Sequence, residues 1–345
     1  MPELRHDPLQ KRWIIIATER AMRPTDFEVC EEPQKENTCP FCEGNESMTP
    51  PEILAYRDEG TQPNEPGWTV RVISNKFPAL RIDGDLDRRG LGLYDAMNGV
   101  GAHEVIIETT EHTLTTADFD HDQMIRVLTI YRDRIADLKK DDRFRYILIF
   151  KNHGEAAGAS LSHSHTQLIA TPVTPRTVAI ELETSKEHYR EKERCLMCDL
   201  IQQETVFPDR IIRDDGHYVI LSPFASRFPF ECWVVPKVHK HAFETTTDEE
   251  LSFLAETMKD ILSRLKICLN DPPYNFILHT SPNTEAKPKR PMYWQTVEFD
   301  YHWHFEIIPR LTRVAGFEWG SGFYINPMPP EEAARYLSQA APKSS

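Results

Sequence analysis

The feature that most constrains the fold of this chain is an ordered set of motifs that occurs twice. Each half begins with a Cys-x-x-Cys pair, continues to a histidine that follows a glutamate by eight residues, and ends in an apolar run and a His-x-His run. Glu104 and His112 have this spacing in the first half, and Glu231 and His239 have it in the second. Self-similarity on this scale indicates one structural unit used twice.

Each half also contains one amphipathic segment of helical period. Apolar residues recur at three- and four-residue steps over 124–138 and over 251–265, which predicts one helix in each half. Capping-box patterns that open at Asp120 and at Thr247 predict where these helices begin.

The short apolar runs 146–150 and 276–278 are rich in β-forming residues and predict strands. We therefore predict an α+β fold of two tandem repeats, each an antiparallel sheet with a helix, with residues 1–175 as the N-terminal domain and residues 176–345 as the C-terminal domain. The charged run 181–194 near the boundary is expected to be a solvent-exposed helix.

Composition excludes several classes of partner. The chain has a formal net charge of −14, which argues against binding to a nucleic acid polymer, since that requires a basic face. No apolar run approaches the roughly 18–20 residues that span a bilayer, and the N-terminus lacks the apolar core of a signal peptide. We predict a cytoplasmic protein without membrane contact, and a small anionic substrate in a local basic pocket is compatible with this charge.

Cysteine usage predicts metal binding. The chain has seven cysteines, and an odd number without a signal peptide argues against a disulfide framework. Zinc prefers four Cys and His ligands in a tetrahedron, and a site closed by four protein ligands is structural. The predicted ligand sets are Cys39, Cys42, His112 and His163 in the first half and Cys195, Cys198, His239 and His302 in the second.

Two alternatives remain open for these residues. The cysteines can be ordinary thiols and the histidines surface residues. At the second site His241, His279 and His304 compete with the predicted histidines, and this site can hold a metal other than zinc.

The run His163-Ser164-His165 carries a candidate nucleophile. Residues two apart in an extended strand share a face, so one imidazole can bind metal while the other stays free. A neutral imidazole is a competent nucleophile toward phosphorus. The alternatives are a second metal ligand or a packed histidine. Glycines and polar donors that suit a phosphoryl group surround the run: Asn152, Gly154, Gly158, Ser160 and Gln167.

The run from Asn152 to Gln167 closely resembles the active-site signature of the galactose-1-phosphate uridylyltransferases, a branch of the histidine-triad superfamily. The resemblance covers most of the chain. Its other motifs are Arg20-Ala-Met-Arg23-Pro24, Cys39-Pro-Phe-Cys42, Asn75-Lys-Phe-Pro-Ala-Leu80, Tyr301-His-Trp-His-Phe305 and the segment from Gly316 to Tyr324.

The resemblance implies a homodimer of chains, each with two histidine-triad-like repeats, that acts on a nucleotide sugar and a sugar 1-phosphate. By this resemblance His165 attacks the α-phosphorus of the nucleotide sugar, and Gln167 and Ser160 contact the phosphoryl group. The substrate-binding residues expected with them are Arg20, offered across the dimer interface, and Arg23, Asn75, Asn152, Gly158 and Glu318.

Three functions compete on this basis. The leading one is ping-pong uridylyl transfer from UDP-glucose to galactose 1-phosphate through a uridylyl-histidine. The second is an ADP-glucose phosphorylase, which passes the nucleotidyl group to phosphate. The third is a nucleotide-binding zinc protein without turnover.

Two departures from the uridylyltransferase pattern bear on this choice. Ser164 stands where the best-known enzymes have proline. At the second site the best-known uridylyltransferases hold iron with a glutamate and three histidines. In this chain the second Cys-x-x-Cys pair predicts zinc at that site, as in the related ADP-glucose phosphorylases.

Overall fold

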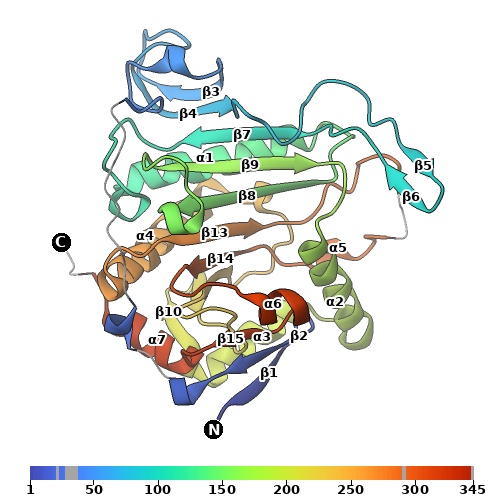
Figure 1. The fold of residues 1–345 in the computed structure, drawn as a ribbon, viewed down its shortest axis with the longest axis vertical. Helices are drawn as coiled ribbons and strands as arrows, with labels where there is room; N and C mark the ends of the chain where they lie inside the picture. Colours follow the sequence, from blue (N-terminus) through green and yellow to red (C-terminus); the bar gives the residue numbers. More distant parts are fainter. Residues whose placement is uncertain (21–22, 28–37, 290–292, 343–345) are drawn as a thin grey trace.

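The computed structural model describes residues 1–20, 23–27, 38–289 and 293–342. Within these residues ten strands form one fully antiparallel sheet in the order β10-β11-β12-β14-β13-β8-β9-β7-β4-β3 (Figure 1). The strands are β3 (Glu52–Arg57), β4 (Trp68–Ser74), β7 (Ala102–Ile107), β8 (Tyr146–His153), β9 (His165–Thr171), β10 (Ile211–Asp214), β11 (Tyr218–Leu221), β12 (Cys232–Pro236), β13 (Tyr274–His279) and β14 (His304–Pro309).

Strands of both halves share this sheet without a break. The junction is the pairing of β8 with β13, in which Phe150 lies opposite Ile277. The predicted strands at 146–150 and 276–278 lie in these two elements. A single sheet therefore places β13 of the second half directly beside β8, and β8 in turn pairs with β9, which begins at His165.

Helices α1 (His121–Leu138) and α4 (Asp248–Leu269) pack against one another and cover one face of the sheet (Figure 1). Their apolar stripes form the main core with the inward side chains of the strands. Both begin where predicted: Asp120 accepts a hydrogen bond from the Gln123 backbone, and Thr247 forms a complete capping box with Glu250.

Smaller elements surround the sheet. The other helices are α2 (Arg176–Lys192), α3 (Leu196–Val206), α5 (Val297–Asp300), α6 (Gly316–Ser321) and α7 (Pro330–Gln339). In the described residues β1 (Glu3–Asp7), β2 (Arg12–Ile16) and β15 (Tyr324–Asn326) form a small separate sheet, and β5 (Arg89–Leu91) and β6 (Tyr94–Ala96) form a projecting hairpin. The 3-10 helices are η1 (Thr18–Arg20), η2 (Pro24–Asp26), η3 (Glu46–Met48), η4 (Thr116–Asp118), η5 (Glu155–Ala157), η6 (Pro208–Arg210) and η7 (Phe243–Thr245).

The charged run 181–194 lies largely in a helix, as predicted, but its first residue is not exposed to solvent. Glu181 on α2 is completely buried. Its carboxylate accepts hydrogen bonds from Gln10 Nε2 and Tyr301 OH and lies 2.8 Å from His279 Nδ1. These partners replace the water that the charge would otherwise require, so the expectation of a fully solvated helix was wrong at this position.

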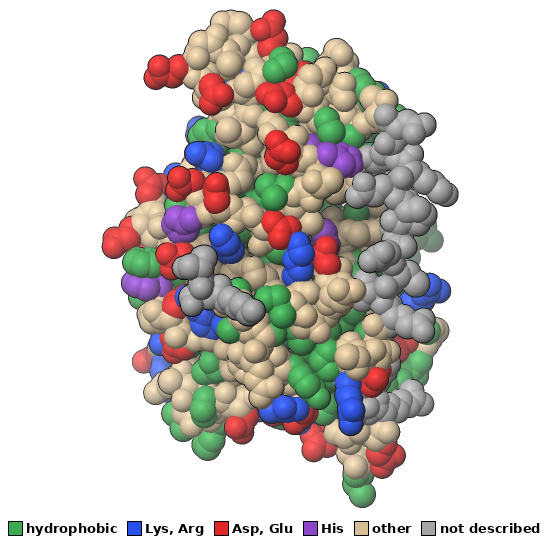
Figure 2. Space-filling model, turned by 90° about the vertical axis from the view of Figure 1, so that its left-hand side faces the viewer, with side chains coloured by type: hydrophobic (Ala, Val, Ile, Leu, Met, Phe, Trp, Pro, Cys, Tyr) green, Lys and Arg blue, Asp and Glu red, His purple; other side chains and the backbone are tan. Residues whose placement is uncertain are grey.

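No helix in the described part of the chain is both long enough and apolar enough to cross a bilayer. On the molecular face shown in Figure 2, basic side chains lie scattered among acidic ones.

Candidate functional site

The first Cys/His group joins residues that are far apart in the sequence. Cys42 Sγ lies 3.4 Å from Nδ1 of His112 and 3.7 Å from Nδ1 of His163, and Cys39 Sγ also lies 3.7 Å from His163 Nδ1. The four ligand atoms all lie within 4.8 Å of one another. The predicted set is therefore brought together.

The second group has the same geometry. Cys198 Sγ lies 3.5 Å from Nδ1 of His239 and of His302, and Cys195 Sγ lies 3.8 Å from His302 Nδ1. Hydrogen bonding with Cys195, together with the bonds to both histidines, lowers the pKa of Cys198, which favours the thiolate that a metal requires. The two histidines that join Cys195 and Cys198 are therefore His239 and His302, and His241 is not a member of the group.

Both groups fit a tetrahedral ion. With Zn–S near 2.3 Å and Zn–N near 2.0–2.1 Å, sulfur and nitrogen ligands lie about 3.5–3.6 Å apart, which is close to the distances found here. The remote ring nitrogens of three ligands face oxygen atoms: His112 faces Ser162 Oγ at 3.2 Å, His163 faces Thr109 O at 2.7 Å, and His239 faces Glu298 O at 3.0 Å. Such contacts leave Nδ1 of each ring as the nitrogen that would face a metal ion.

A third group was not predicted as a separate site. Its members are buried and their ligand atoms lie within 4.8 Å of one another: Glu181, His279, His304 and Glu306. These residue types can bind a divalent cation. However, His279 already pairs with Glu181, which raises the pKa of His279 although burial opposes that shift. The alternatives His279 and His304 at the second site therefore belong to this third group.

His165 is the first residue of β9 and is held in one orientation. Its Nδ1 lies 2.8 Å from the carbonyl oxygen of His163, so the ring hydrogen sits on Nδ1 and the lone pair is on Nε2. The ring is 7% exposed, and burial lowers its pKa to about 4. Phe41, between the two cysteines of the first group, packs against both imidazoles. This state, neutral with a directed lone pair, is the one that a nucleophile requires.

A buried ion pair contacts the His163-Ser164-His165 run. Lys151 Nζ binds the Glu108 carboxylate and donates to Ser164 Oγ and to the carbonyl oxygen of His165, each at 3.0 Å. Glu108 also accepts from Ser164, Thr166, Tyr131 and Thr116. Burial opposes the charge of Glu108, but Lys151 and the hydroxyl donors lower its pKa to about 2. Serine at 164 is therefore part of this network.

The loop after β8 shows why glycines stand at two of its positions. Gly154 and Gly158 both have positive φ, at 81° and 91°, and a Cβ on Gly154 would come within 2.8 Å of Pro273. Asn275, on β13 of the second half, donates to Ala157 O and to Asn152 Oδ1, each at 2.8 Å. The amide of Asn152, a predicted substrate contact, is thus oriented by the other half of the chain.

Gln167 and Asn75, two predicted contacts, converge on one imidazole. Gln167 Oε1 lies 2.9 Å from His103 Nε2, and Asn75 Nδ2 lies 3.1 Å from the same atom. Phe77, beside Asn75, is 83% exposed.

A cleft of about 1580 Å³ runs along the sheet face that α1 and α4 leave open. Its lining includes Asn152, Ser162 and Ile169 from the first half and Arg227 and Trp319 from the second half, and His165 is not among its lining residues. The cleft is large enough for a nucleotide sugar.

Several other predicted substrate-binding residues are not in the lining of this cleft. Ser160 and Arg23 are exposed, and the side chain of Arg20 lies outside the described residues. Glu318 is not in the lining of the cleft. Its carboxylate accepts the Ala315 backbone N–H at 3.0 Å and caps α6.

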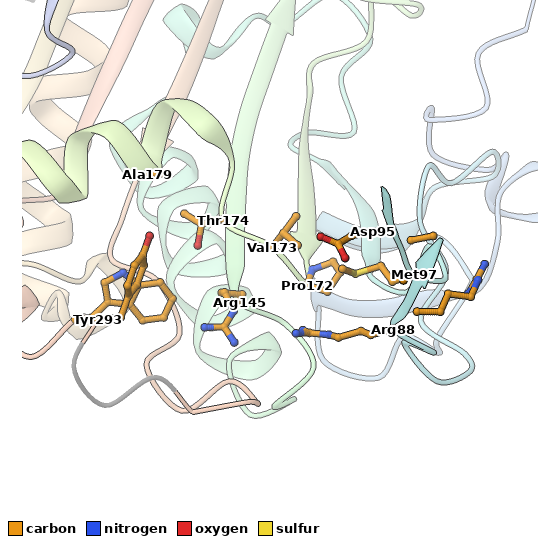
Figure 3. Close-up of a pocket in the computed structure, with 13 residues that line it drawn as sticks. Arg88, Asp95, Met97, Arg145, Pro172, Val173, Thr174, Ala179 and Tyr293 are labelled. Carbon is orange, nitrogen blue, oxygen red and sulfur yellow. The ribbon is translucent and has the colours of Figure 1, made fainter. Parts of the chain in front are cut away.

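A smaller hollow of about 540 Å³ lies at the opposite end of β8 and β9 (Figure 3). Arg88 and Asp95 reach it from the β5–β6 region, and Arg145 and Tyr293 from the other side. It contains no member of the Cys/His groups and no part of the His-Ser-His run among its described residues.

Comparison with known proteins decides the family. The model of the galactose-1-phosphate uridyl transferase N-terminal domain matches residues 1–175. The chain belongs to the galactose-1-phosphate uridylyltransferase family. A further model, of a domain of unknown function, matches residues 99–341.

Among its relatives in this family, an ADP-glucose phosphorylase of Arabidopsis thaliana is 37% identical and aligns over 99% of this chain and 93% of its own length. A galactose-1-phosphate uridylyltransferase of Thermotoga maritima is 28% identical, with 98% of each chain covered. The crystal structure of an Arabidopsis ADP-glucose phosphorylase with bound ADP-glucose superposes with a TM-score of 0.81 at 32% identity, covering 100% of this chain and 99% of that chain.

Sequence reasoning missed the residues that support this family's motif from neighbouring strands. Lys151, Glu108, His103 and Asn275 were not assigned to the site. A weak signal existed for the first two, since each is a charged residue directly after an apolar strand run, where burial requires a partner. The partner itself is set by strand register.

Proposed function

We propose that this chain is a nucleotide-sugar phosphorylase of the ADP-glucose type, which transfers an adenylyl group to phosphate through nucleotidyl-His165. The observation that carries nucleotidyl transfer is the neutral, buried His165 with Nδ1 bound to a carbonyl and Nε2 left with its lone pair. The identity of 37% to an ADP-glucose phosphorylase, against 28% to a uridylyltransferase, supports this substrate class over the uridylyl transfer predicted first.

The reaction needs two balanced displacements. The Nε2 lone pair forms a bond to the α-phosphorus while the bond from phosphorus to the bridging oxygen breaks, and glucose 1-phosphate leaves with that electron pair. A phosphate oxygen then attacks the same phosphorus, the P–N bond breaks, and ADP leaves. During the intermediate, the Nδ1–H of His165 can donate to the His163 carbonyl, which stabilises the positive charge that develops on the ring.

The proposal gives the other predicted residues supporting tasks. Gln167 and Ser160 would donate to the phosphoryl oxygens, and Asn75, Asn152 and Gly158 would hold the nucleotide. Zinc would occupy both Cys/His groups and tie the strands together. We also propose that residues 1–175 and 176–345 are two histidine-triad-like repeats, and that two chains pair as a homodimer in the cytoplasm, with Arg20 contributing across the interface.

Galactose 1-phosphate uridylyltransfer is the second candidate, supported by the family itself and by the Thermotoga relative. An acceptor site for a hexose phosphate would use the cleft near Trp319, and Glu318 would reach a sugar hydroxyl only if it released the Ala315 N–H.

Mass spectrometry of the covalent intermediate separates these functions. Purified protein is incubated with ADP-glucose or with UDP-glucose, then challenged with phosphate or with galactose 1-phosphate. We expect labelling by ADP-glucose and discharge by phosphate with release of ADP. Labelling by UDP-glucose with discharge only by galactose 1-phosphate would establish the uridylyltransferase instead. No label from either donor would contradict the covalent route.

Replacement of Gln167 by alanine should slow labelling without abolishing it. A single donor to a developing phosphoryl charge contributes about 3 kcal/mol, or roughly a hundredfold in rate. Single-turnover labelling measures this, and Gln202→Ala on the exposed surface of α3 is the control. An unchanged rate in Gln167→Ala would show that the amide does not contact the transition state.

A further inference from the structure

The amide of Gln167 has two different ends, and only one of them helps phosphoryl transfer. Its N–H groups can donate to phosphoryl oxygens, whereas its carbonyl oxygen would repel them. In this structure the carbonyl oxygen is turned to His103, whose Nε2 lies 2.9 Å from Gln167 Oε1. The amide nitrogen is therefore the end left for a substrate.

Two side-chain amides approach His103 Nε2, because Asn75 Nδ2 lies 3.1 Å from the same atom. The position of the hydrogen on the ring therefore follows from the contact at Nδ1. The backbone N–H of Ala79 donates to His103 Nδ1 at 3.1 Å. A ring nitrogen that accepts carries no hydrogen, so the hydrogen of the neutral ring is on Nε2. Of these two amide atoms only Gln167 Oε1 can accept this hydrogen, since Asn75 Nδ2 is itself a donor. The Nε2–H group therefore fixes which end of the Gln167 amide faces His103.

The backbone around His103 holds the ring beside Gln167. In the pairing of β7 with β9, Val105 lies opposite Gln167, so His103, two residues before Val105, lies on the same sheet face as the amide. The segment after β4 is bound to the His103 backbone: the Asn75 N–H donates to the carbonyl oxygen of His103 at 2.8 Å, and Asn75 Oδ1 accepts the Phe77 N–H at 2.9 Å.

We propose that His103 is a positioning residue for nucleotidyl transfer: it binds the carbonyl oxygen of Gln167 and so presents the amide N–H groups to the phosphoryl oxygens. This inference rests on the proposed function, because it assigns a task to Gln167 in that reaction. Without the Nε2–H donor, the Gln167 amide can rotate and present either end, and one of the two orientations opposes the reaction.

The test compares single-turnover labelling of His165 by ADP-glucose in four proteins with the wild type. His103→Leu keeps much of the side-chain volume and removes the donor. His103→Gln keeps an N–H group of similar reach. Gln167→Ala and the double variant His103→Leu/Gln167→Ala complete the cycle. Thermal unfolding and metal content confirm that each protein is folded.

We expect His103→Leu to slow labelling about tenfold or more, up to the loss caused by Gln167→Ala, which is on the order of 10²–10³. The ADP-glucose concentration for half-maximal rate should change little, since the defect lies in the chemical step. His103→Gln should recover much of the rate. In the Gln167→Ala background, His103→Leu should cause no further loss.

Two results would overturn this role: wild-type labelling in His103→Leu, or the same fold-loss from His103→Leu with and without the Gln167 amide. If His103→Leu does not fold, the labelling rate of His103→Gln is the deciding measurement. A rate below one tenth of the wild-type rate in a His103→Gln protein of normal stability would contradict the proposed role, because an amide donor at this position would then not suffice. A wild-type protein that no nucleotide sugar labels contradicts the proposed function instead.

Discussion

Replacement of His165 by alanine is expected to abolish nucleotidyl transfer while the protein keeps its fold and its metal ions. Alanine removes the Nε2 lone pair, and no other described side chain is positioned on β9 to form the covalent bond. The ring makes one hydrogen bond, to the His163 carbonyl, and one aromatic contact, with Phe41, so its loss should cost little stability. Loss of the covalent label in mass spectrometry and of product formation measures the effect.

Peptide mapping supplies an internal control for this prediction. His304 has the same place in the second His-x-His run, and its Nδ1 also faces the carbonyl oxygen two residues earlier, at 3.1 Å. However, His304 lies in the buried group with Glu181 and Glu306, where carboxylates would repel a phosphoryl group. The label should therefore be on His165 and not on His304. A His165→Gly variant should regain turnover with added imidazole, and substantial turnover in His165→Ala without rescue would rule out the covalent route.

Replacement of Cys39 by alanine is expected to remove one metal ion and to destabilise the fold by several kcal/mol. In small zinc domains, the structural ion contributes on the order of 10 kcal/mol at neutral pH. Here the first group brings the loop at 39–42 together with His112, which follows β7, and with His163, which precedes β9. Elemental analysis should find two zinc ions per wild-type chain and one in the variant, and thermal unfolding should shift to lower temperature.

Cys268→Ala is the matched control, because Cys268 is a free cysteine outside the Cys/His groups. It should keep both ions. A Cys39→Ala protein that unfolds like the wild type and is only a slow catalyst would contradict a structural role for the first group. If the wild type contains one zinc ion, zinc binding by the second group is contradicted. If it contains none, zinc binding by both groups is contradicted.

The sequence alone identified much of this protein because its decisive motifs are local. A Cys-x-x-Cys pair offers two ligand atoms for a metal ion within four residues, and His163 and His165 are only two residues apart. The strand predicted for both histidines holds only His165, its first residue, because His163 lies in the bend before β9. The helical period over 124–138 and 251–265 is equally local, and the structure confirms both helices. The family resemblance followed from the same runs and is confirmed.

The histidines of the second half show what could not be predicted from local sequence: which of them lie together in one group. His239, His279, His302 and His304 were all available to one metal site by spacing. The fold sends His239 and His302 to Cys195 and Cys198, and sends His279 and His304 to buried carboxylates. The two histidines of a His-x-His run can belong to different sites. Two partners of His304 lie on β13 and α2, and the motif does not determine where these elements lie.

The sequence by itself predicted the four residues of the first Cys/His group, which the structure brings together, the candidate nucleophile and the main elements. Only the tertiary structure decided the partners that support them: Lys151 with Glu108, His103 with Gln167, Asn275 with Asn152, and the buried Glu181. Each of these contacts joins different strands or helices, so it depends on strand register and on how α2 packs. Register is fixed by the packing of the whole sheet, because a shift of one residue would turn every side chain of a strand to the opposite face.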